Sequence, residues 1–510
     1  MYMRNEVILG IDVGTSSIKC SLFDYTGKEI FTSHSEYGLL NPLPGVFEID
    51  TEVLWNAVID SIKKIVMQNE EDGKACRISA IGICAMMIMP VLIDKSNAVI
   101  RPIIHWFDER LQGQYYKLKK SGTDKIIAGI SGSSLTGEST INALAWIMEN
   151  EPANFVRINK FFMIKDFVGF KMTGSILSDY GDASGSQMLD TKKWEWPGNN
   201  GEVIEGLNIK RSIFPELANP QDLRGKLSRE VSNLTGVPEG IPVAIGSGDG
   251  ISTIFGLGTY RDGQTGLIVG SAGVLATSVR DFPSDDKFRT YIFCHPFCDR
   301  WYSMMATASS GEIFRWYYNS VVKNKDLSMA DLDNEAEGVS PGADGIMFLP
   351  YLLGSRNPYS NPGATGVFLG IRYKHERKHL TRAVLEGISF ELLDLLKVEE
   401  EILAKNKMKI NIVKLAGGIV KSKFWMQLLA DILQKDLVTT GAKELGALGS
   451  AIIASVSAGV YKDLETAVKN MVKDDITVKS NPLFKEVYSE KFKLFREIYK
   501  TLESKFEKFA

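Results

Sequence analysis

Residues 7–17 read VILGIDVGTSS, and residues 266–274 read GLIVGSAGV. Each stretch is an apolar strand that enters a tight turn of glycine and hydroxyl residues and leads to a second strand. Because such a turn carries no bulky side chain, its backbone N–H groups can approach an anion closely. One such hairpin in each half of the chain predicts a duplicated phosphate clamp, although either turn alone is equally typical of an ordinary β-hairpin.

Length and composition indicate a globular protein of two domains. The 510 residues are too many for one ordinary core. The content of 44% apolar and 24% charged residues is typical of a soluble protein. A net charge of −3 does not favour a nucleic-acid partner, so we expect none.

Cysteine usage and apolar runs predict a cytoplasmic protein without a membrane segment. The five cysteines are scattered and odd in number, which favours a reducing compartment. Residues 1–6 lack the apolar core of a signal peptide. The longest apolar run, residues 81–93, contains Gly82 and Pro90 and is too short to span a bilayer. The expected partner is a small molecule, and the sequence leaves a homodimer open.

Hydrophobic periodicity predicts alternating strands and helices along the whole chain. Residues 7–36 are expected to form strands, and Thr51 to cap a helix that continues to about residue 68. In the second half, helices are expected at residues 310–324, 377–405, 421–434, 446–458 and 482–508. We place the domain boundary after the strand at residues 240–245, so that residues 1–248 form the first domain and 249–510 the second.

Asp12 is the candidate metal ligand. It stands at the end of an apolar strand, where a carboxylate is costly unless it has a partner. Mg²⁺ held near phosphates would be such a partner. Gly14, Thr15 and Ser16 in the turn would offer hydrogen bonds to ATP phosphates. Lys19 on the following strand is a further candidate phosphate-binding residue. The alternative for Asp12 is a cap or turn residue.

Asp249 is the candidate catalytic residue. It lies in Gly246-Ser247-Gly248-Asp249-Gly250, directly after a buried strand, so little side-chain bulk surrounds it. Phosphoryl transfer to an alcohol needs a carboxylate that accepts the hydroxyl proton. A dinucleotide loop is the alternative, but the glycine spacing is wrong and an acid within the loop would repel pyrophosphate.

Two later segments are candidates for nucleotide contact. Gly417 and Gly418 follow a strand and precede a helix, so Ser422 and the helix start would suit a nucleotide phosphate or a flat adenine. Residues 444–451 form a helix start rich in small residues. They could provide a flat wall for adenine or equally allow close packing against a neighbouring element.

These segments, in this order, resemble the FGGY family of carbohydrate kinases. The most specific match begins at Gly366-Val367-Phe368-Leu369-Gly370-Ile371 and, after seven intervening residues, continues at His379-Leu380-Thr381-Arg382-Ala383-Val384-Leu385-Glu386-Gly387. The turns at residues 12–16 and 270–274, together with Gly248-Asp249, look like the family's metal and phosphate loops and its catalytic aspartate. Ala416-Gly417-Gly418, Trp425, Gln427 and Asp431 look like its nucleotide segment. The likeness covers almost the whole chain.

The resemblance implies an α/β fold of two actin-like ATPase (ribonuclease H-like) domains with a central cleft. Sugar would lie against the first domain and MgATP against the second, with Gly270, Ser271 and Gly273 as the second phosphate loop. Residues 106–110, 165–166 and 182–185 look closest to the xylulose kinases, which implies Met87, Trp106, Asp108 and Asp249 as sugar contacts. We therefore expect an enzyme that phosphorylates a pentulose such as D-xylulose.

Some positions depart from that pattern and keep other interpretations open. The xylulose kinases usually carry Gln-Met-His where this chain has Met86-Met87-Ile88, and residues 143–146 lack the usual lysine. A site without hydrogen bonds for a substrate usually discriminates against it. Gluconate kinases share the Asp-Gly at residues 249–250, so gluconate or another polyol is the alternative substrate. The alternative of another class is a non-catalytic actin-fold ATPase or sugar sensor.

Overall fold

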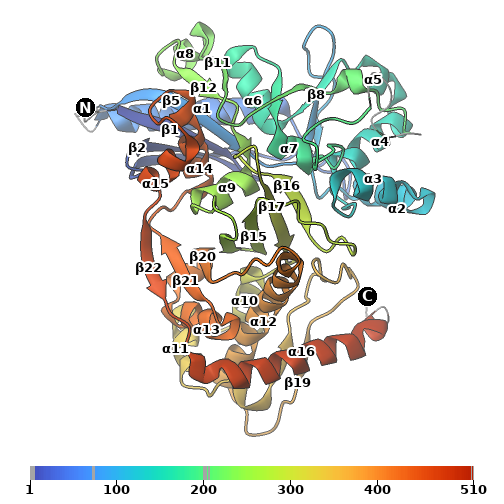
Figure 1. Cartoon of the computed structure of the whole chain (residues 1–510), viewed down its shortest axis with the longest axis vertical. Coiled ribbons are helices and arrows are strands. Elements are labelled where there is room, and N and C mark those ends of the chain that lie inside the picture. Colours follow the sequence, from blue (N-terminus) through green and yellow to red (C-terminus); the bar gives the residue numbers. More distant parts are fainter. Residues whose placement is uncertain (1–5, 72–74, 199–203, 205–206, 507, 509–510) are drawn as a thin grey trace. The chain divides into compact units, whose positions relative to one another are not determined.

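The computed structural model describes residues 6–71, 75–198, 204, 207–506 and 508. Residues 1–5, which belong to the segment considered for a signal peptide, and residue 507 of the last predicted helix lie outside this description. Two compact units interleave along the sequence (Figure 1). Unit 1 takes residues 1–260, 291–302 and 442–473, and unit 2 takes residues 261–290, 303–441 and 474–510. The predicted roles of residues 1–248 and 249–510 stay predictions.

Unit 1 is organised around a mixed sheet with the strand order β11–β12–β5–β1–β2–β3. In that order the strands are Leu223–Lys226, Pro242–Ala244, Arg77–Ala85, Glu6–Val13, Ser17–Asp24 and Glu29–Glu36. The first three strands of the chain form an antiparallel meander, as predicted for residues 7–36, and β5 and β12 join it in parallel. The short strand β13 (Ser247–Gly248) also pairs with β5.

Both faces of this sheet are covered, because alternate residues of β1 enter different cores. Val7, Leu9, Ile11 and Val13 pack with α1 (Thr51–Glu71) and α6 (Ile164–Thr173). Ile8 packs on the other face, with α14 (Leu445–Ser457) and α15 (Leu464–Met471). The two-residue period of a strand therefore decides which β1 side chains face α14.

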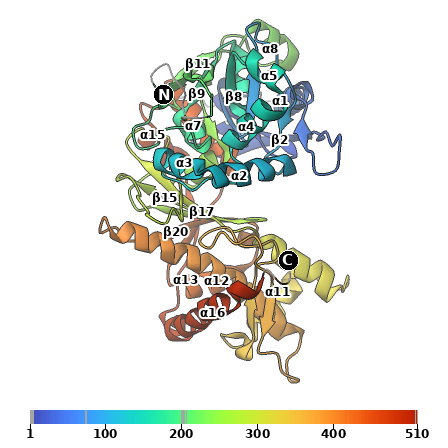
Figure 2. The same cartoon turned by 90° about the vertical axis from the view of Figure 1, so that its right-hand side faces the viewer.

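Unit 2 repeats this plan with the strand order β17–β15–β14–β20–β21–β22. In that order the strands are Trp301–Ala306, Gly273–Val279, Thr265–Val269, Ile412–Gly417, Asp436–Thr440 and Asp474–Val478, and Ser303 is the first β17 residue in unit 2. β14 and β15 form a hairpin, and β20 and β21 follow in parallel. Figure 2 shows α12 (Arg377–Ala404), α13 (Lys423–Leu433) and α16 (Lys485–Phe506) grouped within this unit.

The predicted helices of the second half are present, with small corrections at their ends. The helix expected at 310–324 is α10 (Gly311–Trp316) followed by a π-helical segment, Tyr317–Val322. α16 begins at Lys485, after a 3₁₀ turn. The expected cap of α1 was wrong by one residue. Asp50, not Thr51, accepts hydrogen bonds from the N–H groups of Glu52 (2.8 Å) and Val53 (3.1 Å). Among the described helices, none is both long and apolar enough to cross a bilayer.

Candidate active site

Three predicted site residues of unit 1 come from the carboxyl ends of neighbouring parallel strands. Asp12 is the second-last residue of β1 and is paired in register with Cys84 of β5. Met87 follows the end of β5 by two residues. Asp249 directly follows β13, whose Gly248 is paired with Ala85. In open α/β sheets, ligands bind outside the carboxyl ends of the strands, so this edge is where a site is expected.

The position of Asp12 follows from the packing of β1 against α14. Gly10 is on the same face of β1, and a Cβ added there would lie 2.2 Å from the carbonyl oxygen of Ala447. That close approach brings the start of α14 over the strand. Two residues later on the same face, Asp12 Oδ2 lies 2.6 Å from the position of a Cβ on Gly446. The Asp12 carboxylate therefore lies at a helix N-terminus, where negative charge is stabilised.

The Asp12 carboxyl group fits a cation ligand. Its Oδ1 is buried and has no hydrogen-bond partner. Burial, followed by the neighbouring charge of Asp249, raises the pKa of Asp12 to about 7, and Lys19 opposes this shift. Mg²⁺ takes one or two carboxylate ligands and fills the remaining positions with phosphate and water oxygens. A group of three or more metal-ligating side chains does not occur within the described ranges, so such an ion would depend on the nucleotide.

Lys19 is held beside Asp12 rather than left free in solvent. It is paired with Asp12 in the β1–β2 register. Its Nζ lies 2.9 Å from Oε2 of Glu444, the residue that precedes α14. The side chain is 43% exposed, so the ammonium group can reach an anion while it keeps this ion pair. Glu444 is a residue that the sequence interpretation did not single out.

Asp249 is the first residue of α9 (Asp249–Gly256). Its side chain is half-buried, and its Oδ1 accepts a hydrogen bond of 2.7 Å from the N–H of Gly250. Burial raises the pKa of Asp249 to about 6, and the backbone hydrogen bonds limit the shift. A carboxylate with such a pKa is ionised at neutral pH and is a stronger base than an exposed aspartate.

A buried ion cluster, which the sequence interpretation missed, lies against Gly248, the residue before Asp249. Lys165 Nζ contacts Asp166, and it lies 3.2 Å from Asp179 and 3.7 Å from Asp182. Arg224 also pairs with Asp166. Asp182 is buried, and neither of its oxygens has a hydrogen-bond partner; burial raises its pKa well above the usual value. Its Oδ1 lies 2.9 Å from a Cβ position on Gly248, so the cluster supports the backbone that carries Asp249.

Trp106 and Asp108 lie in the loop before α2 (Glu109–Ser121). Trp106 is 37% exposed, so it is open to a ligand. Asp108 is buried, and its oxygens accept hydrogen bonds from the N–H of Phe47 and from the backbone and guanidinium of Arg110. These bonds fix the loop, so a sugar contact at Asp108 would have to be added to them.

In unit 2 the turn after β14 lies against the start of α10. The N–H of Gly311 donates to the carbonyl of Gly270 (2.9 Å), and the N–H of Ser310 donates to the carbonyl of Ser271 (2.7 Å). Ser271 is exposed. The N–H of Gly273 donates to Thr307 Oγ1 at 2.8 Å. Ser271 is therefore the predicted residue of this turn that is most open to a phosphate.

The predicted nucleotide residues lie beside that turn. Gly417 ends β20, next to Val269 of β14, and has φ 97°. A Cβ there would lie 2.3 Å from the carbonyl oxygen of Val269, so only glycine fits. Gly418 is exposed, and Ser422 Oγ accepts a hydrogen bond from the N–H of Trp425 at the start of α13. The structure thus brings these residues to one edge of the sheet in unit 2.

The small residues at the start of α14 serve close packing. A Cβ on Gly449 would lie 2.0 Å from the carbonyl oxygen of Ser252 in α9. The carbonyl oxygen of Leu445 lies 2.2 Å from a Cβ position on Gly256 of the same helix. Of the two interpretations of residues 444–451, these contacts support packing between α14 and α9.

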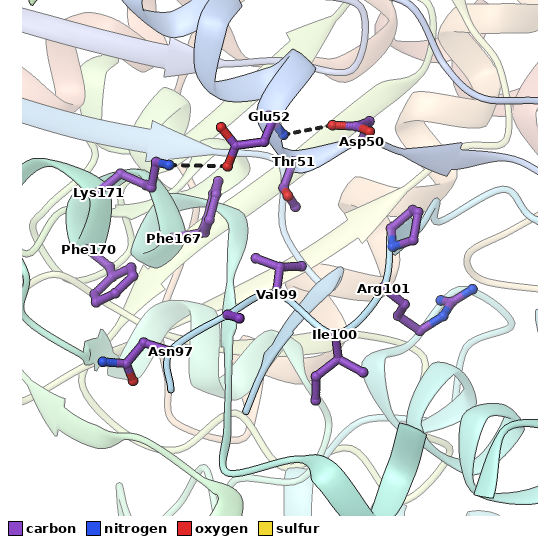
Figure 3. Close-up of a pocket in the computed structure, with 12 residues that line it drawn as sticks. Asp50, Thr51, Glu52, Asn97, Val99, Ile100, Arg101, Phe167, Phe170 and Lys171 are labelled. Carbon is purple, nitrogen blue, oxygen red and sulfur yellow. Dashed lines mark hydrogen bonds and ion pairs between the residues drawn. The ribbon is translucent and has the colours of Figure 1, made fainter. Parts of the chain in front are cut away.

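A groove of about 580 Å³ lies elsewhere in unit 1 (Figure 3). Phe167 and Phe170 of α6 and Val99 and Ile100 form apolar parts of its wall, and Lys171 pairs with Glu52 at 3.2 Å. None of the predicted catalytic, phosphate-binding or sugar-binding residues lines it. The candidate site residues therefore do not form this groove.

Models of one protein family match both halves of the chain. The model of the N-terminal domain of the FGGY family of carbohydrate kinases matches residues 7–256. The model of the C-terminal domain of the same family matches residues 279–458. The two matches include the candidate residues from Asp12 to Asp249 and from Gly417 to Ser422, whereas Gly270, Ser271 and Gly273 lie between the matched ranges.

Individual relatives agree with the family models. The xylulose kinase of Lactococcus lactis is 30% identical over 97% of this chain and 96% of its own length. The solved xylulose kinase of Lactobacillus acidophilus has a TM-score of 0.91 at 25% identity, over 99% of this chain and 100% of that one. A gluconate kinase from the same organism has the same TM-score, identity and coverage. The predicted actin-like ATPase fold is confirmed. The chain belongs to the FGGY family of carbohydrate kinases and is a sugar kinase.

Proposed function

We propose that this sugar kinase transfers the γ-phosphoryl group of MgATP to a primary hydroxyl of a pentulose such as D-xylulose, with Asp249 as the general base. The half-buried Asp249 carboxyl group, with a pKa of about 6, carries the proposal. It is ionised at neutral pH, so it can accept the hydroxyl proton as the new P–O bond forms. The likeness to xylulose kinases supports the choice of sugar.

Asp12 is the proposed protein ligand of Mg²⁺. Its buried, unpartnered Oδ1 and its place at the start of α14 support this role. When bound, the ion would neutralise the charge of the phosphate oxygens. Asp12 would fix the ion beside Asp249. Lys19 would supply a further positive charge for the phosphates while it remains paired with Glu444.

ATP would be held by two groups of small and hydroxyl residues. In unit 1 these are Gly14, Thr15, Ser16 and Lys19; in unit 2 they are Gly270, Ser271, Gly273, Gly417, Gly418 and Ser422. Short side chains allow phosphate oxygens to approach backbone N–H and hydroxyl donors closely. The sugar would contact Met87, Trp106 and Asp108 in unit 1, together with Asp249.

Gluconate is a second candidate acceptor. The gluconate kinase of Lactobacillus acidophilus resembles this chain as closely in fold and identity as the xylulose kinase does. A sugar acid would need a cationic or hydrogen-bonding partner for its carboxylate. The substrate test must therefore include it.

The direct test is ADP release by the purified protein with MgATP and single sugars: D-xylulose, D-ribulose, L-xylulose, gluconate, glycerol, erythritol and a deoxy-ketose. Strong stimulation by a pentulose is expected. Stimulation by gluconate alone would keep the kinase and change the acceptor. ATP hydrolysis at the same rate with and without every sugar would contradict the proposed reaction.

A further inference from the structure

A corner of apolar side chains lies next to Asp249 in unit 1. The Met87 side chain packs against the glycines on both sides of Asp249. Its Sδ lies 2.5 Å from the point where a Cβ would stand on Gly248 and 3.9 Å from the equivalent point on Gly250. Its Cε reaches in the other direction, to 2.9 Å from a Cβ position on Gly185. The Met87 side chain thus extends from the Asp249 backbone to Gly185 in α7 (Tyr180–Gly185).

At Gly185, Met87 meets two further apolar side chains. The three atoms nearest to a Cβ position there are Met87 Cε, Ile88 Cγ2 and Phe293 Cε1, the last two at 3.5 Å. All three are carbon atoms of apolar side chains. Met87, Ile88 and Phe293 are each half-buried, so each keeps part of its surface open to a bound molecule. We call these three residues the apolar corner.

The backbone of Ile88 gives an independent sign of function. Its φ is +68°, in the left-handed region that a β-branched residue rarely adopts. The hydroxyl of Thr140 donates a hydrogen bond of 2.7 Å to the carbonyl of Ile88 and helps to hold this conformation. Strained residues of this kind concentrate where a binding site requires a particular side-chain direction. An asparagine or glycine would relieve the strain, yet the chain has an isoleucine that directs Cγ2 into the corner.

We infer that the apolar corner selects a particular acceptor sugar. In this sugar, the carbon that contacts the corner bears a methyl group or hydrogen instead of a hydroxyl. The inference rests on the proposed sugar kinase reaction. A fully hydroxylated sugar would place a hydroxyl against three carbon atoms and lose its hydrogen bonds to water, whereas a methyl group would be buried favourably. The preferred class is a deoxyketose that is phosphorylated at the hydroxyl received by Asp249.

The test compares kcat/KM for D-xylulose and 1-deoxy-D-xylulose, which differ by one hydroxyl at the end opposite the primary hydroxyl at carbon 5. A hydrophobic pocket discriminates by about 10- to 100-fold between groups that differ in this way. We expect the wild-type protein to prefer the deoxy sugar within that range. A preference for D-xylulose would overturn the inference, and so would turnover of gluconate alone.

Ile88→Asn and Ile88→Gly separate the apolar corner from folding. Both residues accept positive φ more readily than isoleucine, so both variants should fold at least as well as the wild type. Ile88→Asn adds a polar group and should shift the ratio toward D-xylulose by about tenfold or more. Ile88→Gly should only weaken the deoxy preference. An unchanged ratio in Ile88→Asn would contradict the inference.

The matched control is Phe288→Asn in unit 2, which also replaces an apolar residue at positive φ, here 50°. This variant should keep the wild-type ratio of the two sugars. A change as large as that of Ile88→Asn would show that the ratio does not report on the corner. Absence of sugar-dependent turnover with every acceptor would instead overturn the proposed function itself, and the inference with it.

Discussion

The turn at residues 14–17 and the turn at residues 270–273 have the same strand plan but different chemistry. Each joins two antiparallel strands, and each first strand has a parallel neighbour on its other side. The first turn lies beside Asp12, Lys19 and Asp249, and helix α14 begins above Asp12. The second turn is lined by the backbone of residues 310–311 and by the hydroxyls of Thr307 and Ser310.

Under the proposed reaction, this difference predicts a different role for each turn. A carboxylate close to transferred phosphate is unfavourable unless it binds a cation or accepts a proton. The first turn has two such carboxyl groups, and the pKa values of both are raised by burial. The second turn presents glycine and serine, which can bind a nucleotide phosphate without contributing a charged side chain. We therefore expect substitutions at the first turn to affect chemistry, and those at the second to affect nucleotide binding.

The largest expected effect is that of Asp249→Asn. It should lower kcat by roughly 10²- to 10⁴-fold, the usual contribution of a general base. The amide keeps the size of the side chain but cannot accept the proton. Coupled measurement of ADP release at saturating sugar and MgATP gives kcat directly. Asp344→Asn, which changes an exposed carboxylate paired with Lys374 in unit 2, is the matched control and should keep wild-type kcat.

Asp12→Asn should have the next largest effect. Loss of one fixed charge at the reacting centre typically costs about 10²-fold in kcat. Because the proposed role is to hold Mg²⁺, half-maximal activity should also require more Mg²⁺ than in the wild type. Titration of activity with Mg²⁺ at constant ATP measures this shift. An unchanged Mg²⁺ requirement together with full kcat would remove Asp12 from the metal site.

Two glycine substitutions sharpen the comparison of the turns. Gly446→Ala places a methyl group 2.6 Å from Asp12 Oδ2 at a helix position where alanine is favourable, so activity should fall while stability changes little. Gly417→Ala forces a residue into φ 97° and 2.3 Å from a backbone oxygen, so it should destabilise the protein by about 1–3 kcal/mol. Urea unfolding and kcat, measured on both variants, test the contrast. The reverse pattern would contradict it.

Ser271→Ala should have the smallest effect. It removes one hydroxyl from an exposed turn, and a single neutral hydrogen bond contributes about 0.5–1.5 kcal/mol, which corresponds to about tenfold or less in affinity. The KM for ATP should therefore rise by up to about tenfold with little change in kcat. If kcat fell as far as in Asp249→Asn, the second turn would also take part in the chemical step.

Local sequence patterns were sufficient to predict much of this fold. The apolar run at residues 7–13 predicted β1, and the pattern of residues 377–405 predicted α12 within one residue at its end. The family resemblance then predicted the actin-like ATPase fold. The interleaving of the units was not predicted, because residues 442–473 return to unit 1 through contacts distant in sequence, such as Gly10 with Ala447.

Parts of the candidate site that depend on packing also escaped sequence reasoning. Glu444 lies 425 positions after its partner Lys19, and no local pattern connects them. Asp182 belongs to a segment quoted for its resemblance, but its burial beside Lys165 is evident only in three dimensions. Ile88 was noted as a departure from the xylulose kinases, and its positive φ could not be anticipated for a β-branched residue.

The central claim is that the Asp249 carboxylate accepts the hydroxyl proton, and a pH profile tests it most directly. The active form is the carboxylate, so activity should be lost as pH falls through its pKa of about 6. At saturating Mg²⁺, which would keep the Asp12 carboxylate ionised, wild-type kcat/KM should rise about tenfold per pH unit below 6 and level off above it. Circular dichroism at each pH would confirm that the protein stays folded. In Asp249→Asn the residual activity should lack this rise. The same profile in both proteins would contradict the account.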